Sequence, residues 1–414
     1  MGKEQFNFVI VGHVDHGKST LIGRLLYDTN SLPEGKMDEL KKTCEMMGKP
    51  LEFAYLLDHL QEEREQNITI DTTQIFFKTQ KKEYVIIDAP GHKEFLKNMI
   101  TGASLAESAI LIVDAKEGVQ EQTKRHSYIL GLLGLKQVIV VINKMDLVEY
   151  KKEKFEEIKK EIVSFLSRLN IYPSFIIPIS AMEGDNIANK SKNIGWYEGL
   201  TVLEALDTFK DTDIMEEKAL RLPIQDVYKF DERRILAGRI ESGKIKKNDE
   251  IILLPEYTET IVKSIEEFNR QRDVVEAGIS IGITTTEPIF TERGSVICKK
   301  GENLPKIINT LQGNIFWMSK TPFKKGERIF LKLATQEVEC ILEKIITKMN
   351  SSSLESIGND ETQIENTEVA KIICKLDKPI VVEDFNITPE LGRFVLIQNE
   401  DICAGGILTN IYGD

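Results

Sequence analysis

Short, wholly apolar runs recur along the first half of the chain, and amphipathic stretches separate them. Apolar runs rich in β-branched residues are typical of strands that are buried on both faces of a parallel sheet. Because helical patterns lie between the runs, the alternation predicts a doubly wound α/β domain. The runs are 8–11, 84–87, 110–113, 138–142 and 175–177.

The clearest helical pattern extends from Glu153 to Leu169. Its apolar side chains recur at spacings of three and four, which places them on one stripe of a helix. The segment therefore predicts a helix that packs against the sheet. The residues of the stripe are Phe155, Ile158, Ile162, Phe165, Leu166 and Leu169.

After Leu222 the pattern changes, and short strand-like runs follow one another between turns rich in Gly, Pro and Asn. Regular spacing of this kind is typical of a small β-barrel. A second series of such runs starts near Gln312 and is interrupted by the polar segment 351–367, which predicts a loop. The strand-like runs are 239–243, 250–255, 295–298, 328–333, 337–342 and 393–397.

Together these patterns predict an α/β domain with a mostly parallel, doubly wound sheet, followed by two small β-barrel domains. The predicted domains span residues 1–212, 213–302 and 303–414. The length agrees, because 414 residues at roughly 150 residues per domain suggest about three hydrophobic cores.

Charge and apolar content narrow the setting in which the protein works. The formal net charge of -12 argues against a nonspecific coat of nucleic acid, which needs a basic face. The N-terminus shows no signal-peptide pattern, and no apolar run approaches the roughly 18 residues of a membrane-spanning helix. We therefore expect a cytoplasmic protein without a membrane partner.

Cysteine and histidine spacing predicts neither a disulfide framework nor a zinc site. The cysteines are scattered, odd in number and without a C-x-x-C pair, which indicates thiols in a reducing compartment. They are Cys44, Cys298, Cys340, Cys374 and Cys403. Four histidines show no metal-ligand spacing, and we expect them in loops or on helix surfaces. These are His13, His16, His59 and His126.

A phosphate-binding motif follows the first predicted strand and precedes a predicted helix. Its glycines let main-chain N–H groups wrap around phosphates, and the helix adds the dipole of its N-terminus. Lys18 is expected to neutralise the β- and γ-phosphates, and Ser19 to ligate Mg²⁺. The motif, which fits G-x-x-x-x-G-K-[ST], reads Gly12-His13-Val14-Asp15-His16-Gly17-Lys18-Ser19.

A second motif, Asp88-Ala89-Pro90-Gly91-His92, follows the apolar run 84–87. The carboxylate of Asp88, at the end of a strand, suits the second coordination sphere of Mg²⁺. Gly91 can turn its N–H toward a γ-phosphate. The motif therefore extends the predicted phosphate site to a second strand.

The third motif predicts which base is bound. It is Asn143-Lys144-Met145-Asp146, at the end of the run 138–142. The carboxylate of Asp146 can accept two hydrogen bonds from guanine N1 and the 2-amino group, which adenine cannot offer. Ser180 and Ala181, after the run 175–177, complete the predicted pocket, where a main-chain N–H can meet guanine O6. The predicted ligand is GTP.

These motifs, in this order, resemble the translation-factor class of GTPases, and the resemblance covers nearly the whole chain. It implies a P-loop GTPase domain, two β-barrels, and GTP with Mg²⁺ as ligands. The segments that carry it are Gly12-His13-Val14-Asp15-His16-Gly17-Lys18-Ser19-Thr20, Asp88-Ala89-Pro90-Gly91-His92 and Asn98-Met99-Ile100-Thr101-Gly102-Ala103-Ser104.

The same resemblance assigns roles around the γ-phosphate. It implies that His92 is the catalytic residue that orients the attacking water, and that Val14 and Ile68 form an apolar gate before it. Thr69 would be a second protein ligand of Mg²⁺. The family usually has Gly before that Ile-Thr pair, whereas this chain has Asn67.

Two members of this class have the predicted layout. One is the elongation factor that carries aminoacyl-tRNA to the ribosome, which the phosphate motif resembles. The other is the GTPase subunit of the two-subunit sulfate adenylyltransferase, which couples GTP hydrolysis to synthesis of adenosine 5′-phosphosulfate on a small catalytic partner subunit. A scaffold that has lost hydrolysis is disfavoured, because the residues for hydrolysis are all present.

Three barrel segments favour the sulfate-activating subunit. The turn Asp231-Glu232-Arg233-Arg234 is charged where tRNA carriers have a Gly-rich turn near the aminoacyl pocket. Asn314-Ile315-Phe316-Trp317-Met318 resembles an apolar strand of the sulfate-activating subunits. Asn399-Glu400-Asp401 stands where tRNA carriers usually place a basic residue facing RNA, and carboxylates near RNA phosphate are unfavourable. The sequence therefore predicts the sulfate-activating subunit, with the tRNA carrier as the alternative.

Overall fold

In the computed structural model the chain divides into two compact units, Met1–Asp211 and Thr212–Asp414. Each unit has its own cores, and each is described by itself below. The structure describes residues 5–32, 34–46, 53, 73–88, 106, 108–135, 137–209, 215–230, 233–267, 272–357, 362–409 and 411.

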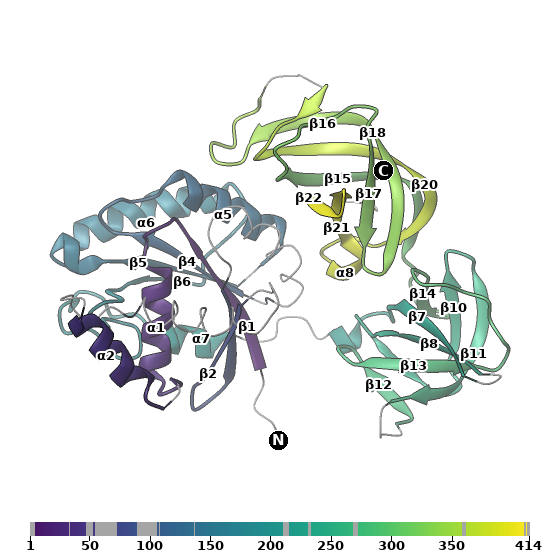
Figure 1. Ribbon diagram of the computed structural model, residues 1–414, viewed down its shortest axis with the longest axis horizontal. Helices are drawn as coiled ribbons and strands as arrows, with labels where there is room; N and C mark the ends of the chain where they lie inside the picture. Colours follow the sequence, from purple (N-terminus) through teal and green to yellow (C-terminus); the bar gives the residue numbers. More distant parts are fainter. Residues whose placement is uncertain are drawn as a thin grey trace. The chain divides into compact units, whose positions relative to one another are not determined.

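The first unit contains a six-stranded sheet in the order β2-β3-β1-β4-β5-β6 (Figure 1). Neighbouring strands are parallel except for β2 and β3, which are antiparallel. The predicted mostly parallel α/β sheet is confirmed. The strands are β1 (Gln5–Gly12), β2 (Thr73–Lys78), β3 (Glu83–Asp88), β4 (Ser108–Asp114), β5 (Gln137–Asn143) and β6 (Phe175–Pro178).

Helices cover both faces of this sheet, with α1 and α7 on one face and α5 and α6 on the other (Figure 1). The predicted helix 153–169 is α6, which ends at Ser167, so Leu169 lies beyond it. A capping box on Thr201 starts α7 and satisfies main-chain N–H groups of its first turn. The α-helices are α1 (Lys18–Asp28), α2 (Lys36–Met46), α5 (Glu121–Leu132), α6 (Lys152–Ser167) and α7 (Val202–Thr208).

The described part of the second unit starts with the short 3-10 helix η2 (Met215–Glu217) and continues into a closed barrel in the order β10-β11-β13-β8-β7-β14. The predicted strand 239–243 was wrong beyond its first residue, because β8 ends at Arg239. The strands are β7 (Leu222–Phe230), β8 (Arg233–Arg239), β10 (Glu250–Leu254), β11 (Thr258–Glu266), β13 (Ser280–Thr285) and β14 (Val296–Lys299), beside a two-stranded sheet of β9 (Lys244–Lys246) and β12 (Val274–Glu276).

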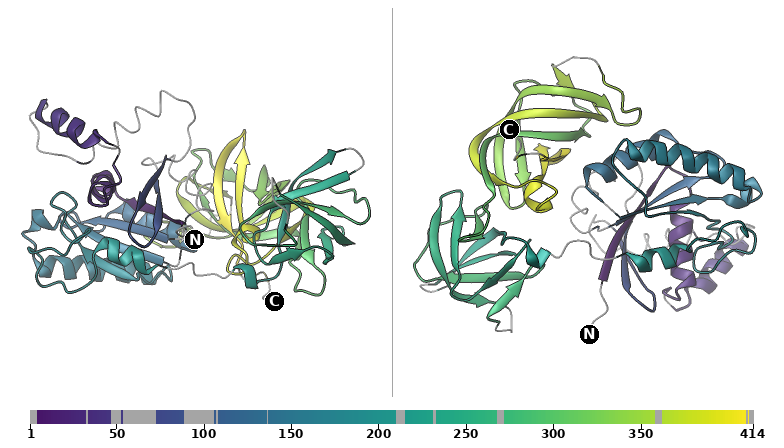
Figure 2. Two further views of the ribbon diagram at one scale, coloured as in Figure 1. Left: turned by 90° about the horizontal axis from the view of Figure 1, so that it is seen from below. Right: turned by 180° about the vertical axis from the view of Figure 1, so that it is seen from behind.

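A second closed barrel follows in the order β15-β20-β18-β17-β21-β22, and Figure 2 shows both barrels from two further sides. The predicted run 337–342 is part of a longer strand, and the predicted loop 351–367 contains the short strand β19. The elements are β15 (Lys306–Trp317), β17 (Arg328–Leu333), β18 (Gln336–Asn350), β20 (Glu368–Val382), α8 (Pro389–Gly392), β21 (Arg393–Gln398) and β22 (Asp401–Ile407), with β16 (Phe323–Lys324) paired to β19 (Gln363–Ile364).

The two barrels of the second unit share apolar contacts and a buried ion pair. The core of the second barrel includes side chains of the first, among them Ile252 and Leu254. At the same junction the guanidinium of Arg221 binds both carboxylate oxygens of Glu383, at 2.9 Å and 2.7 Å. Apolar packing and a bidentate charge pair therefore join the barrels.

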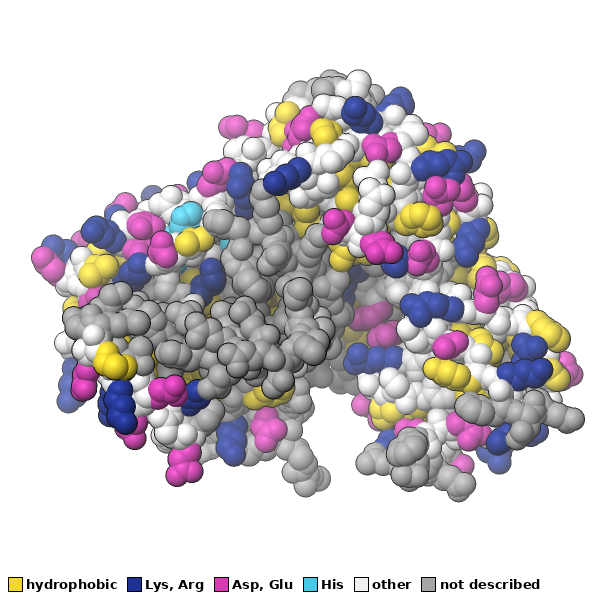
Figure 3. Space-filling view, in the orientation of Figure 1, with side chains coloured by type: hydrophobic (Ala, Val, Ile, Leu, Met, Phe, Trp, Pro, Cys, Tyr) yellow, Lys and Arg dark blue, Asp and Glu magenta, His cyan; other side chains and the backbone are white. Residues whose placement is uncertain are grey.

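All five cysteines lie in the described part of the chain, and they are buried and form no disulfide. No helix among the described residues combines the length and the apolar content needed to cross a membrane. On the face shown in Figure 3, acidic and basic side chains are interspersed over the described surface.

Candidate nucleotide site

The phosphate motif forms the connection between β1, which ends at Gly12, and α1, which begins at Lys18. This is the strand–loop–helix context that the sequence predicts. Gly17 has φ 92°, a left-handed conformation that favours glycine. A Cβ at Gly17 would also lie 2.4 Å from the amide nitrogen of Asn143. Both the turn and the close contact therefore require glycine at this position.

The first turn of α1 suits an anion. It contains no acidic residue, and its N-cap is Gly17, which has no side chain to cap the helix. Main-chain N–H groups and the helix dipole at such an end attract phosphate. Lys18 donates from Nζ to the carbonyl of Gly12 at 3.2 Å, so its amine is folded back across the loop. Ser19 and Thr20, on the same turn, are half-buried.

Part of the predicted γ-phosphate side lies outside the described residues. This holds for Ile68, Thr69, Gly91 and His92 and for the side chain of Asp88. His59, which was expected in a loop or on a helix surface, also lies outside the described residues. The main chain of Asp88 ends β3, which is paired with β1. Val14, the other half of the predicted gate, is on the phosphate loop and 36% exposed.

Asn143, at the end of β5, joins two loops. Its amide nitrogen donates to the carbonyl of His16 on the phosphate loop at 2.9 Å. Its amide oxygen accepts from the N–H of Ala181, also at 2.9 Å. The side chain is buried, and hydrogen bonds in a buried setting are costly to lose. Asn143 therefore fixes the phosphate loop relative to the predicted base loop.

Lys144 links the base motif after β5 to the end of β4. Its Nζ lies 2.7 Å from the carboxylate of Asp114, a buried residue at the end of β4. Burial alone would raise the pKa of Asp114. The amine of Lys144 and the main-chain N–H groups of Lys116 and Glu117 outweigh burial and lower that pKa. The base motif is thus held by a carboxylate that stays ionised, which the sequence analysis did not single out.

The base loop follows β6. Ser180 is buried, and its hydroxyl accepts from the N–H of Glu183 at 3.3 Å. The N–H of Ala181 donates to Asn143 and so holds the loop in place. Asp146, the predicted guanine-selective residue, is half-buried in the short 3-10 helix Met145–Val148. The carboxyl ends of β5 and β6 therefore bring the predicted base-binding residues together.

His16 corrects one prediction. It was expected in a loop or on a surface, yet its side chain is 0% exposed. The ring fits between the phosphate loop and the end of β4, with Nδ1 3.2 Å from the main-chain nitrogen of Asp114. Its ring centroid is 5.0 Å from that of His13. His126, on α5, is half-buried.

Mg²⁺ in nucleotide sites is held by few protein ligands together with phosphate oxygens and water. The described residues contain no cluster of His, Cys, Asp or Glu that could hold a metal by itself. The hydroxyl of Ser19, on the first turn of α1, fits the protein-ligand role. The second predicted ligand, Thr69, lies outside the described residues.

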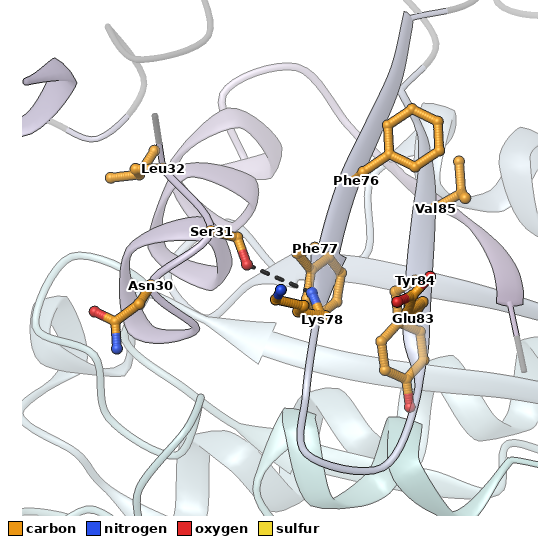
Figure 4. A pocket seen from close by; sticks show the side chains of 9 residues that line it. All are labelled: Asn30, Ser31, Leu32, Phe76, Phe77, Lys78, Glu83, Tyr84 and Val85. Carbon is orange, nitrogen blue, oxygen red and sulfur yellow. Dashed lines mark hydrogen bonds between the residues drawn. The ribbon is translucent and has the colours of Figure 1, made fainter. Parts of the chain in front are cut away.

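A separate pocket of about 390 Å³ lies elsewhere on the first unit (Figure 4). It is lined by the turn after α1 and by strands β2 and β3, and the hydroxyl of Ser31 accepts from the N–H of Lys78 there. None of the predicted nucleotide-binding residues lines it. The pocket is therefore separate from the predicted nucleotide site.

Comparisons with known proteins agree with this geometry. The family described as elongation factor Tu GTP binding domain matches residues 3–212. Elongation factor Tu domain 2 matches residues 233–298, and the GTP-eEF1A C-terminal domain-like family matches residues 310–409. These matches follow the order of the α/β domain and the two barrels.

Relatives that match over nearly the whole chain support the same family. The chain is 37% identical to elongation factor 1-alpha of Methanopyrus kandleri, over 99% of this chain and 98% of that protein. It is 36% identical to sulfate adenylyltransferase subunit 1 of Pseudoalteromonas atlantica, over 99% of this chain and 88% of that protein. The motifs, the fold and these matches together show that the chain belongs to the translation-factor class of GTPases, with a GTP-binding domain that implies GTPase activity.

Proposed function

We propose that this GTPase is the regulatory subunit of a two-subunit sulfate adenylyltransferase. In this role it couples GTP hydrolysis to formation of adenosine 5′-phosphosulfate from ATP and sulfate on a smaller catalytic subunit. Overall identity does not discriminate, because the relatives named elongation factor 1-alpha and sulfate adenylyltransferase subunit 1 match at 37% and 36%. Local features of the second barrel carry the proposal.

The main observation is an acidic hairpin between β21 and β22. Gln398 pairs with Asp401, which leaves Asn399 and Glu400 as the loop. Both loop residues have positive φ, 50° and 66°, as in a type I′ turn. Glu400 and Asp401 are exposed. A tight turn therefore presents two carboxylates to solvent, where a tRNA carrier would need to attract RNA phosphate.

The other two barrel segments contribute less. Trp317 is 1% exposed and stacks on Phe323, with ring centroids 5.0 Å apart, so it is a core residue. In the charged turn near residue 233, Asp231 and Glu232 lie outside the described residues. The described half of that turn consists of Arg233 and Arg234 and is cationic. The guanidinium of Arg234 lies over the ring of Phe290, 4.3 Å from its centroid. The acidic hairpin is thus the observation on which the proposal rests.

In this proposal the predicted site residues have the following roles. The phosphate loop and α1 bind the phosphates, and Asp146 selects guanine. Mg²⁺, held by Ser19 and Thr69, would neutralise charge on the β- and γ-phosphates. His92 would orient the attacking water. Release of γ-phosphate would change the affinity for the partner, since coupling requires that the partner bind the two nucleotide states differently.

A second candidate is an elongation-factor-like carrier of aminoacyl-tRNA. The observation that favours it is the phosphate motif, which resembles that of this carrier. Full-length similarity allows it equally, for example 37% identity to elongation factor 1-alpha of Pyrococcus furiosus over 99% of this chain. In that case the partners would be aminoacyl-tRNA and the ribosome. The acidic hairpin argues against it.

The experiment compares the two partners directly. The chain is mixed with its cognate small adenylyltransferase subunit, ATP and sulfate, and formation of adenosine 5′-phosphosulfate is measured with and without GTP. We expect GTP to accelerate the reaction. In parallel, the chain with GTP is mixed with charged tRNA, and we expect no protection of the aminoacyl ester from hydrolysis, even at low salt.

Asp146→Asn provides the matched control. The 2-oxo group of xanthine needs a donor where the carboxylate stood, so this variant should respond to xanthosine triphosphate instead of GTP. Acceleration that follows this switch shows that the nucleotide acts on this chain. GTP-dependent protection of the aminoacyl ester, or no effect of either nucleotide on adenylylation, would reject the proposal in favour of the second candidate or of neither.

A further inference from the structure

The ring of His16 provides a hydrogen-bond acceptor for the main chain at the end of β4. The last pair between β1 and β4 is Gly12 with Ile112, and beyond it β1 leaves the sheet as the phosphate loop. Ala115, next to Asp114, donates its N–H to Asn143 on the β5 side. The N–H of Asp114 points the other way, toward the place that β1 has left, and donates to Nδ1 of His16 at 3.2 Å.

The shorter of the two Nδ1 contacts assigns the tautomer of the ring. An N–H can donate to Nδ1 only if that nitrogen carries a lone pair, so the ring proton is on Nε2. The alternative, donation from Nδ1 to the carbonyl of Ile112, would span 3.5 Å, which is beyond the usual range. Nε2 in turn faces the carboxylate of Glu117 at 3.3 Å.

Burial keeps this ring neutral. It lowers the pKa of His16 and outweighs the carbonyl of Ile112 and the carboxylates of Asp114 and Glu117, which raise that pKa, while His13 acts in the same direction as burial. The carboxylate of Asp114 is already paired with Lys144. A second proton would place an N–H at Nδ1, directly against the N–H of Asp114, and would break the contact.

The main chain of His16 has a second attachment, since its carbonyl accepts from Asn143. We propose that His16 is a positioning residue whose neutral, Nε2-protonated ring holds the phosphate loop against the end of β4. Nucleotide affinity then depends on a hydrogen-bond acceptor at the position of Nδ1. The proposal concerns nucleotide binding and is independent of which partner the GTPase serves.

Three variants separate the two ring nitrogens. The amide of Asn can place an oxygen near the Nδ1 position, that of Gln reaches the Nε2 position, and Leu offers neither. Affinity is measured with fluorescently labelled GDP at pH 7.5. His16→Asn should bind within a few-fold of the wild type, and His16→Leu and His16→Gln roughly 10- to 100-fold more weakly, because they leave the buried N–H of Asp114 without an acceptor.

A pH series distinguishes positioning from general stability. Below the lowered pKa, wild-type affinity should fall as the ring takes up a proton, and His16→Asn should lack that phase because its amide does not titrate. Thermal unfolding of the nucleotide-free variants is recorded alongside. The proposal would be overturned if His16→Asn and His16→Gln lost affinity equally. It would also be overturned if the affinity of each variant fell only in proportion to its thermal unfolding midpoint.

Nitrogen NMR of the wild-type ring provides a test that needs no variant. A lone pair at Nδ1 and a proton at Nε2 give clearly different ¹⁵N shifts, and these identify the tautomer. We expect the unprotonated signal at Nδ1 throughout the neutral range. A protonated Nδ1 in this range would contradict the arrangement directly.

Discussion

The nucleotide site of the first unit and the barrel junction of the second unit both bury polar groups, but in different ways. At the nucleotide site, buried side chains bind main-chain atoms of neighbouring loops, as Asn143 binds His16 and Ala181. At the junction two charged side chains bind each other: Arg221 and Glu383 are only 2% and 4% exposed. The first arrangement fixes loops, and the second fixes whole barrels.

This difference indicates what each region contributes. A side chain that spans two loops determines the shape of a ligand site, so its loss should appear mainly in affinity. A buried ion pair between barrels has its partners fully desolvated, so removing one partner leaves an uncompensated charge. Its loss should appear mainly in stability. Variants in the two regions should therefore produce separable effects.

Arg221→Ala should have the largest effect. It leaves the buried carboxylate of Glu383 unpaired, which costs about 3–5 kcal/mol in comparable sites. Arg221 also donates to the carbonyls of Leu220 and Asn303, so these contacts are lost as well. The loss in the free energy of unfolding is measured by urea unfolding of the second unit. Unfolding is followed by Trp317 fluorescence in a Trp196→Phe background.

The control for this variant is the double replacement Arg221→Met with Glu383→Met, which removes both charges. It should recover much of the lost stability, because no buried charge remains. GDP affinity should stay unchanged in both proteins. A parallel fall in GDP affinity would contradict the separation of the two regions.

Asn143→Ala should have the next largest effect. It removes both links of the amide and leaves the buried carbonyl of His16 and N–H of Ala181 without this partner. GDP affinity should fall roughly 10- to 100-fold, equivalent to about 1–3 kcal/mol. Asn193→Ala, which truncates an exposed amide in the same domain, is the matched control and should bind normally. A shift in the unfolding of the second unit would count against this interpretation.

Much of this site could be predicted from sequence because it depends on local patterns. Apolar runs located β1 and β3 to β6, and the motifs located Gly17 and Lys18 at the start of α1 and Asn143 at the end of β5. The edge strand β2 was missed: it is partly exposed and antiparallel, so it lacks the continuous apolar run of its neighbours.

Long-range contacts explain what the sequence analysis missed at the site itself. His16 is buried by groups such as Asp114, which lies 98 positions away in the chain. No local pattern around His16 signals this contact. Asp114 was likewise not singled out as the partner of Lys144, because strand order in the sheet, not sequence spacing, brings their ends together.

The contribution of Glu241 to the pH dependence of the second unit's stability should be smaller than the effects above and opposite in sign to that of ordinary acid unfolding. Burial and the nearby carboxylate of Glu390 raise the pKa of Glu241 to about 7, against the opposing effect of Arg239 and Arg393. For a carboxyl group whose folded pKa is raised, stability is greatest below the unfolded pKa and is lost as pH rises through the folded value.

The second unit should therefore lose roughly 1–2 kcal/mol of stability from this group between about pH 5 and pH 8. Glu241→Gln should flatten that slope, since the amide does not titrate. The measurement is the urea midpoint of Trp317 fluorescence at several pH values. An equal slope in the variant would mean that another group titrates.

Arg24→Lys should have the smallest effect and tests how far the nucleotide site extends. Arg24 on α1 donates to Asp28 at 2.9 Å, but its contact with the carbonyl of Met182 on the base loop is 3.3 Å long and partly exposed. Lys keeps a charge near Asp28 and loses the reach to Met182. Because long, exposed contacts contribute little, GDP affinity should change at most a few-fold, or less than about 1 kcal/mol. A loss as large as that of Asn143→Ala would show that the base loop is held from α1 as firmly as from β5, and that the buried amide is not the principal link.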